Sequence, residues 1–112
     1  MYRANHVFVM FVVLTKFVYF FEALIREFEF IADNVNLRKW RHLMRTLGVT
    51  DTDIERLAEQ YRTNVREQVL QALLLWESRS GAEASRAVLT DALRNCQLRL
   101  LADKLEGFDE LH

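Results

Sequence analysis

Apolar residues recur at three- and four-residue steps along most of this chain, and no proline interrupts them. The pattern is clearest in three runs, at Trp40–Ile54, in the stretch that ends at Trp76, and at Ala92–Leu105. Such spacing places the apolar side chains on one face of an α-helix. Helices this short are stable only when their apolar faces pack against one another. The sequence therefore predicts an all-α bundle.

Six helices are predicted from this pattern and from the residues that cap helix ends. The first begins near Phe20, and the second spans about residues 37–47, where Gly48 follows as a left-handed cap residue. Thr50 is the predicted cap of the third helix, because its hydroxyl can accept a hydrogen bond from a free backbone N–H of the first turn. Asn64 is the predicted cap of the fourth helix for the same reason.

The last two helices are placed by similar signals. Ser80 and Glu83 have the spacing of a capping box and predict the start of the fifth helix. Asn95 is the predicted cap of the sixth helix, which Gly107 ends. Connections of two to six residues between such helices imply an antiparallel bundle. The predicted core residues on the inward faces are Trp40, Leu43, Leu47, Ile54, Leu57, Val69, Leu73, Trp76, Leu93 and Leu101.

The N-terminal part of the chain has a different character. Residues 7–21 are almost wholly apolar apart from Lys16, but this run is 15 residues long, against roughly 20 for a helix that crosses a bilayer. No small-residue cleavage site follows it, which argues against a secretory signal. It remains open whether the run precedes a buried first helix, anchors the protein in a membrane or is foreign to the native domain. We divide the chain into an apolar leader over residues 1–20, a helical domain over 21–107 and a tail over 108–112.

Composition and charge narrow the possible functions. The chain has 112 residues, of which 51% are apolar and 28% charged, so it can bury one hydrophobic core. Its formal net charge of −1 lacks the basic excess of a nucleic-acid-binding domain, so nucleic acid is not an expected partner. Cys96 is the only cysteine, which excludes an intramolecular disulfide and predicts a cytoplasmic protein.

The sequence contains no set of residues that is typical of an enzyme. His6, His42 and His112 have no metal-ligand spacing with Cys96 or with one another, and there is no glycine-rich phosphate loop or nucleophile motif. We therefore expect no catalytic residue, no metal and no cofactor. The function to expect is binding.

Opposite charges gather on the second and third predicted helices. The basic group is Arg38, Lys39, Arg41 and Arg45, and the acidic group is Asp51, Asp53, Glu55 and Glu59. Charged surface helices are common, and acidic residues at a helix start also interact favourably with the helix dipole. The alternative is that the two groups form a self-complementary surface, suited to contacts that extend from one molecule to the next.

Several short motifs in the predicted bundle are more specific than helix periodicity requires. They are D-N-V at 33–35, W-R at 40–41, V-T-D-T at 49–52, Y-R-T-N at 61–64, R-E-Q-V at 66–69, Trp76, A-L-R-N-C-Q at 92–97 and L-A-D at 101–103. Over about residues 28–106, the chain resembles the death domain superfamily, and within it the Fas-associated adaptors. The resemblance implies a six-helix antiparallel Greek-key bundle. It also implies a non-enzymatic adaptor that binds death domains of receptors or adaptors by homotypic contacts, in multimeric complexes of apoptotic or innate-immune signalling.

The resemblance also indicates which residues contact the partner. It points to the region of the second and third helices, where Arg41 and Arg45 form a basic half, Asp51 an acidic half and Val49 an apolar point between them. The expected partner-binding residues are Arg38, Arg41, Arg45, Val49, Asp51, Asp53, Glu55 and Asp103. The apolar leader stands where these adaptors carry a death-effector domain, so the resemblance does not imply caspase recruitment. The alternative function is a membrane-anchored helical scaffold whose only membrane contact is through residues 7–21.

Overall fold

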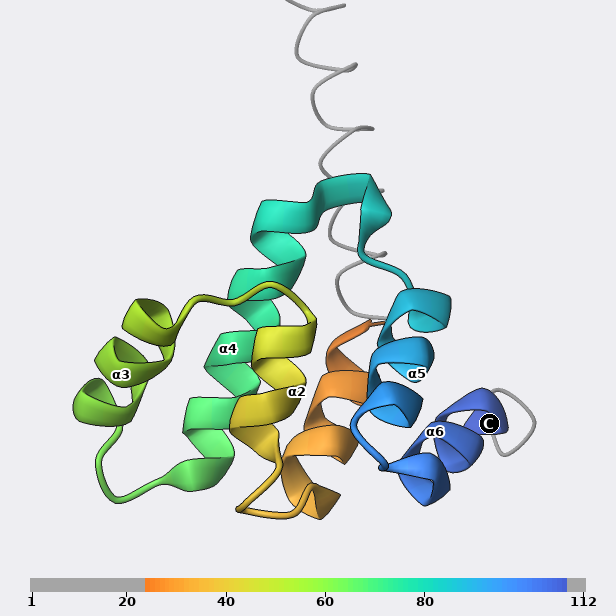
Figure 1. The fold of residues 1–112 in the computed structure, drawn as a ribbon, viewed down its shortest axis with the longest axis horizontal. Helices are drawn as coiled ribbons and strands as arrows, with labels where there is room; N and C mark the ends of the chain where they lie inside the picture. Colours follow the sequence, from red (N-terminus) through yellow and green to blue (C-terminus); the bar gives the residue numbers. More distant parts are fainter. Residues whose placement is uncertain (1–23, 109–112) are drawn as a thin grey trace, which may run out of the picture.

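The computed structural model describes residues 24–108, which form helices and no strand (Figure 1). The first described helix covers residues 24–34, shown in orange. The other elements are α2 (Trp40–Thr46), α3 (Asp51–Gln60), α4 (Val65–Ser80), the short 3-10 helix η1 (Gly81–Glu83), α5 (Arg86–Asn95) and α6 (Arg99–Glu106). These are the six α-helices that the sequence predicts. The expected start of the first helix near Phe20, the leader and most of the tail lie outside the described residues.

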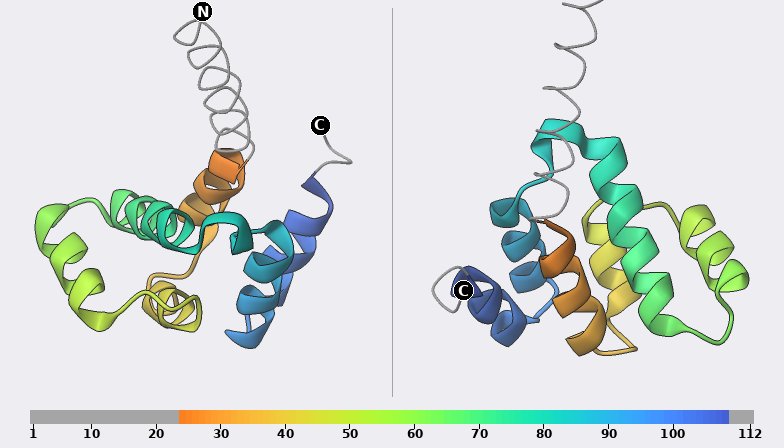
Figure 2. Two further views of the ribbon diagram at one scale, coloured as in Figure 1. Left: turned by 90° about the horizontal axis from the view of Figure 1, so that it is seen from above. Right: turned by 180° about the vertical axis from the view of Figure 1, so that it is seen from behind.

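Several helices that are consecutive in the chain pack together, and α2 also contacts helices further along the chain. α5 packs against α6, α3 packs against α4, and α2 contacts α3, α4 and α5. α3 and α6 stand at opposite edges of the bundle, and the 24–34 helix lies between them (Figures 1 and 2). Within this described part of the chain, no helix is long and apolar enough to cross a membrane.

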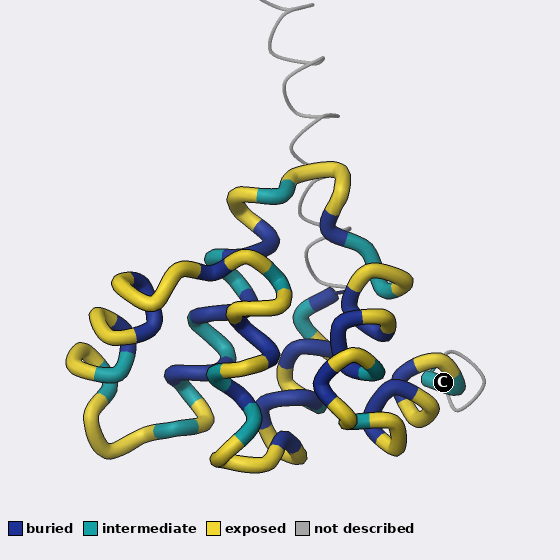
Figure 3. The backbone as a smooth tube through the Cα atoms, viewed as in Figure 1, coloured by how far each residue is buried: buried dark blue, intermediate teal, exposed yellow. Residues whose placement is uncertain are grey.

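The core lies where the inward faces of the helices meet, shown by the buried positions in Figure 3. All but one of the predicted core residues are buried, namely Trp40, Leu43, Ile54, Leu57, Val69, Leu73, Trp76, Leu93 and Leu101. Leu47 is the exception, because it stands at the C-terminal cap of α2 and is half-buried against the core. The rings of Phe28 and Trp76 meet edge to face, with centroids 6.1 Å apart. Phe30 contacts Phe108 in a second aromatic pair, with centroids 5.5 Å apart.

Two of the predicted helix starts are confirmed by their hydrogen bonds. The Thr50 hydroxyl oxygen accepts from the backbone N–H of Asp53 at 3.2 Å and begins α3. The Asn64 side chain accepts from the backbone N–H of Glu67 at 3.0 Å and begins α4. Each bond joins residues three positions apart, so the local sequence is sufficient to predict it.

The predicted start of α5 is wrong. α4 continues through Ser80 and ends where Gly81 adopts a positive φ of 58°. After the 3-10 turn, Ser85 caps α5 by accepting from the backbone N–H of Val88 at 3.2 Å. Val88, in the first turn of α5, is 43% exposed, whereas Leu89 and Leu93 are buried.

The predicted cap of α6 is also wrong, because α5 extends through Asn95. Gln97 ends α5 in a left-handed conformation, with φ at 63°, and α6 begins after Leu98. The Gln97 N–H donates to the Arg94 carbonyl at 3.0 Å, and the Leu98 N–H donates to the Leu93 carbonyl at 2.8 Å. These two bonds define a Schellman motif, which usually has glycine at the left-handed position. Gly48, with φ at 94°, holds the matching position after α2, as predicted.

Replacing Gln97 by glycine should stabilise the domain. Gln97 is the one non-glycine residue with a positive φ among residues 24–108, and a side chain in that conformation is strained. We expect Gln97→Gly to raise the free energy of unfolding by about 0.5–1 kcal/mol, measured by urea denaturation. Gln97→Ala keeps the Cβ atom and should remain within about 0.5 kcal/mol of wild type. An equal gain in both variants would show that the backbone is not the cause.

Candidate functional site

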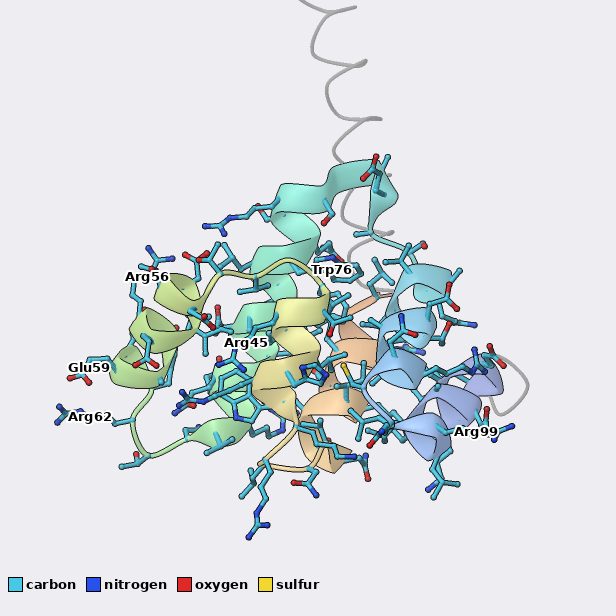
Figure 4. All side chains as sticks on the ribbon, in the orientation of Figure 1. Arg45, Arg56, Glu59, Arg62, Trp76 and Arg99 are labelled. Carbon is cyan, nitrogen blue, oxygen red and sulfur yellow. The ribbon has the colours of Figure 1, made fainter. Side chains whose placement is uncertain are left out.

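The turn between α2 and α3 brings the predicted basic and acidic residues together. Arg45 Nε lies 2.5 Å from Asp51 Oδ1, and Arg41 lies 3.4 Å from Glu55 Oε1. Arg45 projects between the two helices (Figure 4). Arg41 and Arg45 of the basic group are therefore paired with Glu55 and Asp51 of the acidic group within one molecule, which the sequence pattern did not reveal.

These ion pairs are open to solvent. The side chains of Arg45 and Asp51 are 51% and 73% exposed, and those of Arg41 and Glu55 are 41% and 74% exposed. Exposed pairs of this kind contribute about 0.2–1 kcal/mol each, because water screens the attraction and two long side chains lose freedom. Such pairs hold the fold only weakly, and their charges remain accessible to another molecule.

Arg38 completes this surface. It lies in the exposed turn before α2, where its backbone N–H donates to the Asn36 side chain at 2.7 Å. No carboxylate is within ion-pair distance of its guanidinium among the described residues. We use the name α2–α3 corner for the exposed set Arg38, Arg41, Arg45, Asp51 and Glu55.

Asp103, also predicted to bind a partner, lies away from this corner. It is on α6, at the opposite edge of the bundle from α3 (Figure 1). Its carboxylate pairs with Arg94 of α5 at 3.3 Å, and Glu106 pairs with the same arginine at 2.8 Å. Asp103 therefore helps to hold α6 against α5 and is not part of the corner.

The prediction that Val49 offers an apolar contact to a partner is corrected by its burial. Val49 is only 3% exposed and belongs to the core. It follows Gly48, and its N–H donates to the Met44 carbonyl at 2.9 Å, as in a Schellman motif. The residue at this position of the motif packs back against its own helix. Val49 thus fixes the turn that positions the corner.

Asp53 is corrected in the same way, because it is buried between α3 and α4. Its carboxylate accepts from the Thr50 hydroxyl at 2.7 Å, from Arg56 at 3.1 Å, and from Arg79 through two hydrogen bonds. These bonds, above all those from Arg79, lower the pKa of Asp53 from 3.8 to about 2. Asp53 joins two helices and is not available to a partner.

This network predicts how stability depends on acid. A carboxylate whose pKa is lower in the folded protein stabilises the fold above its ordinary pKa, and this contribution is lost as pH falls through the folded value. For Asp53, the loss runs from about pH 4 to about pH 2. Asp53→Asn should be less stable than wild type at pH 7. Between about pH 4 and about pH 2, its free energy of unfolding should fall less than that of wild type. Urea denaturation at pH 7, 4 and 2.5 measures both effects. Arg79→Gln should reproduce them, and an unchanged acid profile in both variants would contradict the assignment.

A second buried ion pair, which sequence reasoning missed, joins Glu27 of the 24–34 helix to Arg86 of α5. The Glu27 side chain is 3% exposed, and Arg86 of α5 donates to its Oε1 atom from Nε at 3.0 Å and from a terminal nitrogen at 2.7 Å. The two residues are 59 positions apart. No local signal connects them, and a charged residue beside an apolar stripe normally faces water.

The described chain offers no metal-binding cluster. No three His, Cys, Asp or Glu side chains within it could hold a metal ion. Cys96 is buried at the end of α5, where its sulfur lies 3.2 Å from the Thr46 hydroxyl. His42 is exposed on α2, and His6 and His112 lie outside the described residues.

An all-helical bundle whose distinctive surface is a corner of exposed, mutually paired charges has the character of a protein-interaction domain. A sequence model of the death domain family matches residues 25–108, so the chain belongs to the death domain family. Membership confirms the predicted fold and the resemblance seen in the motifs, and it places the chain in a non-enzymatic class of adaptor and interaction domains.

Curated relatives carry the same domain within longer proteins. The FAS-associated death domain protein of Bos taurus is 44% identical over 78 residues, which cover 70% of this chain and 37% of that protein. Its Homo sapiens counterpart is 39% identical over 85 residues, covering 76% of this chain and 40% of that protein. Tumor necrosis factor receptor superfamily member 10B of Mus musculus is 36% identical over 81 residues, covering 72% of this chain and 21% of that protein. The chain thus spans less than half the length of these relatives.

Proposed function

We propose that this chain is a non-enzymatic adaptor that binds death domains of receptors or other adaptors by homotypic contacts in apoptotic signalling. Its similarity to FAS-associated death domain proteins and to a tumor necrosis factor receptor family member supports this proposal. We further propose that it acts in the cytoplasm and assembles into multimeric complexes, where weak single interfaces add up through high effective concentration.

The α2–α3 corner is the surface that we propose for the receptor contact. The observation that carries this choice is the exposure of Arg41 and Arg45, whose only ion pairs in the described chain are the weak ones to α3. Arginine forms planar, directional hydrogen bonds with carboxylates and is enriched in interfaces. The partner that fits is therefore a death domain with an acidic surface.

The proposal is tested by titrating the full 112-residue chain with the purified death domain of the Fas receptor and measuring binding by calorimetry. We expect saturable binding. A helical bundle of another family, matched in size and net charge to the receptor domain, serves as the control and should not bind. If the receptor domain and this control behave alike, the proposed function is wrong.

The apolar leader allows a direct test of the alternative, a membrane-anchored scaffold. That reading depends on residues 7–21, which lie outside the described part of the structure. A chain that begins at Glu22 should keep its receptor binding if the protein is an adaptor. If the leader is an anchor, the full chain pellets with membranes and the shortened chain does not.

A further inference from the structure

In the free domain, carboxylates of α3 already occupy the positions that an acidic partner would take beside Arg41 and Arg45. We propose that Asp51 and Glu55 are internal competitors of the partner, so that binding proceeds by exchange of ion pairs at the α2–α3 corner. This inference rests on the proposed function and adds to it a built-in limit on affinity.

The backbone holds the competing carboxylate in place independently of the ion pair. Gly48 turns the chain after α2, and Thr50 caps α3 through its bond to the Asp53 N–H. Asp51 is consequently fixed as the first residue of α3, where the helix dipole favours a negative charge. A carboxylate held six residues from Arg45 is always close to it, so the internal pair can form in every free molecule.

The strength of the competition follows from the exposure of the pair. An exposed ion pair of this type is closed about one to five times as often as it is open. A ligand that needs the open form binds more weakly by the fraction of molecules in that form. Removing the Asp51 charge should therefore strengthen binding of an acidic partner about two- to sixfold.

The first experiment compares Asp51→Asn with a matched control on the same helix. Glu59→Gln also removes one negative charge from α3, but Glu59 pairs with Arg62 at 2.6 Å and not with α2 (Figure 4). Titration with the Fas receptor death domain should show about two- to sixfold tighter binding for Asp51→Asn and little change for Glu59→Gln. Equal gains in affinity for the two variants would show that the effect comes from net charge alone, and this would overturn the proposal. Weaker binding by Asp51→Asn would show that Asp51 itself contacts the receptor, and would also overturn it.

A second comparison asks whether the gain passes through Arg45. In an Arg45→Gln background there is no cation for Asp51 to occupy, so adding Asp51→Asn should change binding by less than about twofold. The salt dependence of binding provides a further readout. In wild type, salt weakens the intermolecular pair but also weakens the internal pair that competes with it, so the two effects partly cancel. Binding by Asp51→Asn should therefore fall more steeply with salt than binding by wild type. A full gain in the Arg45→Gln background would contradict the exchange.

A measurement without any partner separates this inference from the proposed function. Exchange of the Arg45 Nε–H with water, followed by NMR, should be faster in Asp51→Asn than in wild type, and unchanged in Glu59→Gln. Equal exchange in wild type and Asp51→Asn would overturn the internal competitor even if the receptor binds. Failure of the wild type to bind the receptor would instead overturn the proposed function, and the competitor with it.

Discussion

Trp76→Ala should remove most of the stability of this domain. Trp76 is 4% exposed in the inward face of α4, and its ring packs edge to face against Phe28 of the 24–34 helix. The truncation leaves a cavity and should lower the free energy of unfolding by about 3–5 kcal/mol, a large share of the roughly 5–15 kcal/mol of a small domain. We expect the melting temperature to fall by more than about 10 °C, measured by circular dichroism.

A matched truncation at the surface is the control for this result. Leu100 is 74% exposed on α6, so Leu100→Ala removes apolar volume without opening a cavity and should stay within about 0.5 kcal/mol of wild type. If Trp76→Ala melted as close to wild type as Leu100→Ala, Trp76 would not be packed in solution. A ring available for stacking on a ligand would then have to be considered.

Arg45→Glu should weaken receptor binding about thirtyfold with much less effect on folding. The change places a negative charge at the α2–α3 corner, against the acidic partner surface that we propose and beside Asp51. Loss of a charge from its partner at an interface costs about 2–5 kcal/mol, and the lower figure corresponds to about thirtyfold at 1.4 kcal/mol per decade. The fold loses one exposed ion pair, worth about 0.2–1 kcal/mol. Calorimetric titration gives the affinity, and urea denaturation of the same sample gives the stability.

Arg99→Glu is the charge-matched control. Arg99 is exposed at the start of α6, far from Arg45 in Figure 4, and glutamate is well tolerated at a helix start. The affinity of Arg99→Glu for the receptor domain should remain within about threefold of wild type. This change is much smaller than the loss of about thirtyfold expected for Arg45→Glu. Equal losses in the two variants would indicate a general charge effect. No loss in either, at low salt where charge effects are largest, would show that the corner does not make the contact.

Much of this fold follows from short-range information. The helix periodicity and the caps at Thr50 and Asn64 depend on residues within one or two turns, so the sequence predicts them well. The errors at α5 and α6 arise because the residues expected as caps, Ser80 and Asn95, are instead the last residues of the preceding helices. At the second of these ends, Gln97 takes a conformation that usually requires glycine, which no propensity predicts.

The site was only partly predictable because its geometry depends on contacts between distant residues. Asp53 was expected at the surface, but Arg79 reaches it from 26 positions away and draws it into the α3–α4 contact. The sequence showed opposite charges on α2 and α3, but it could not show that Arg41 and Arg45 pair with Glu55 and Asp51. Side-chain pairing of this kind becomes visible only when the turn at Gly48 is known in three dimensions.

The contact between Phe30 and Phe108 has a consequence for how this domain can be tethered. It brings the last described residue against the first described helix, so both described ends emerge on one side of the bundle. Seen from above in Figure 2, α2 and the turn to α3 lie on the opposite side. The described ends at residues 24 and 108 therefore lie away from α2, the helix that carries Arg41 and Arg45. A longer protein can hold the domain by either end and still leave these arginines uncovered for docking.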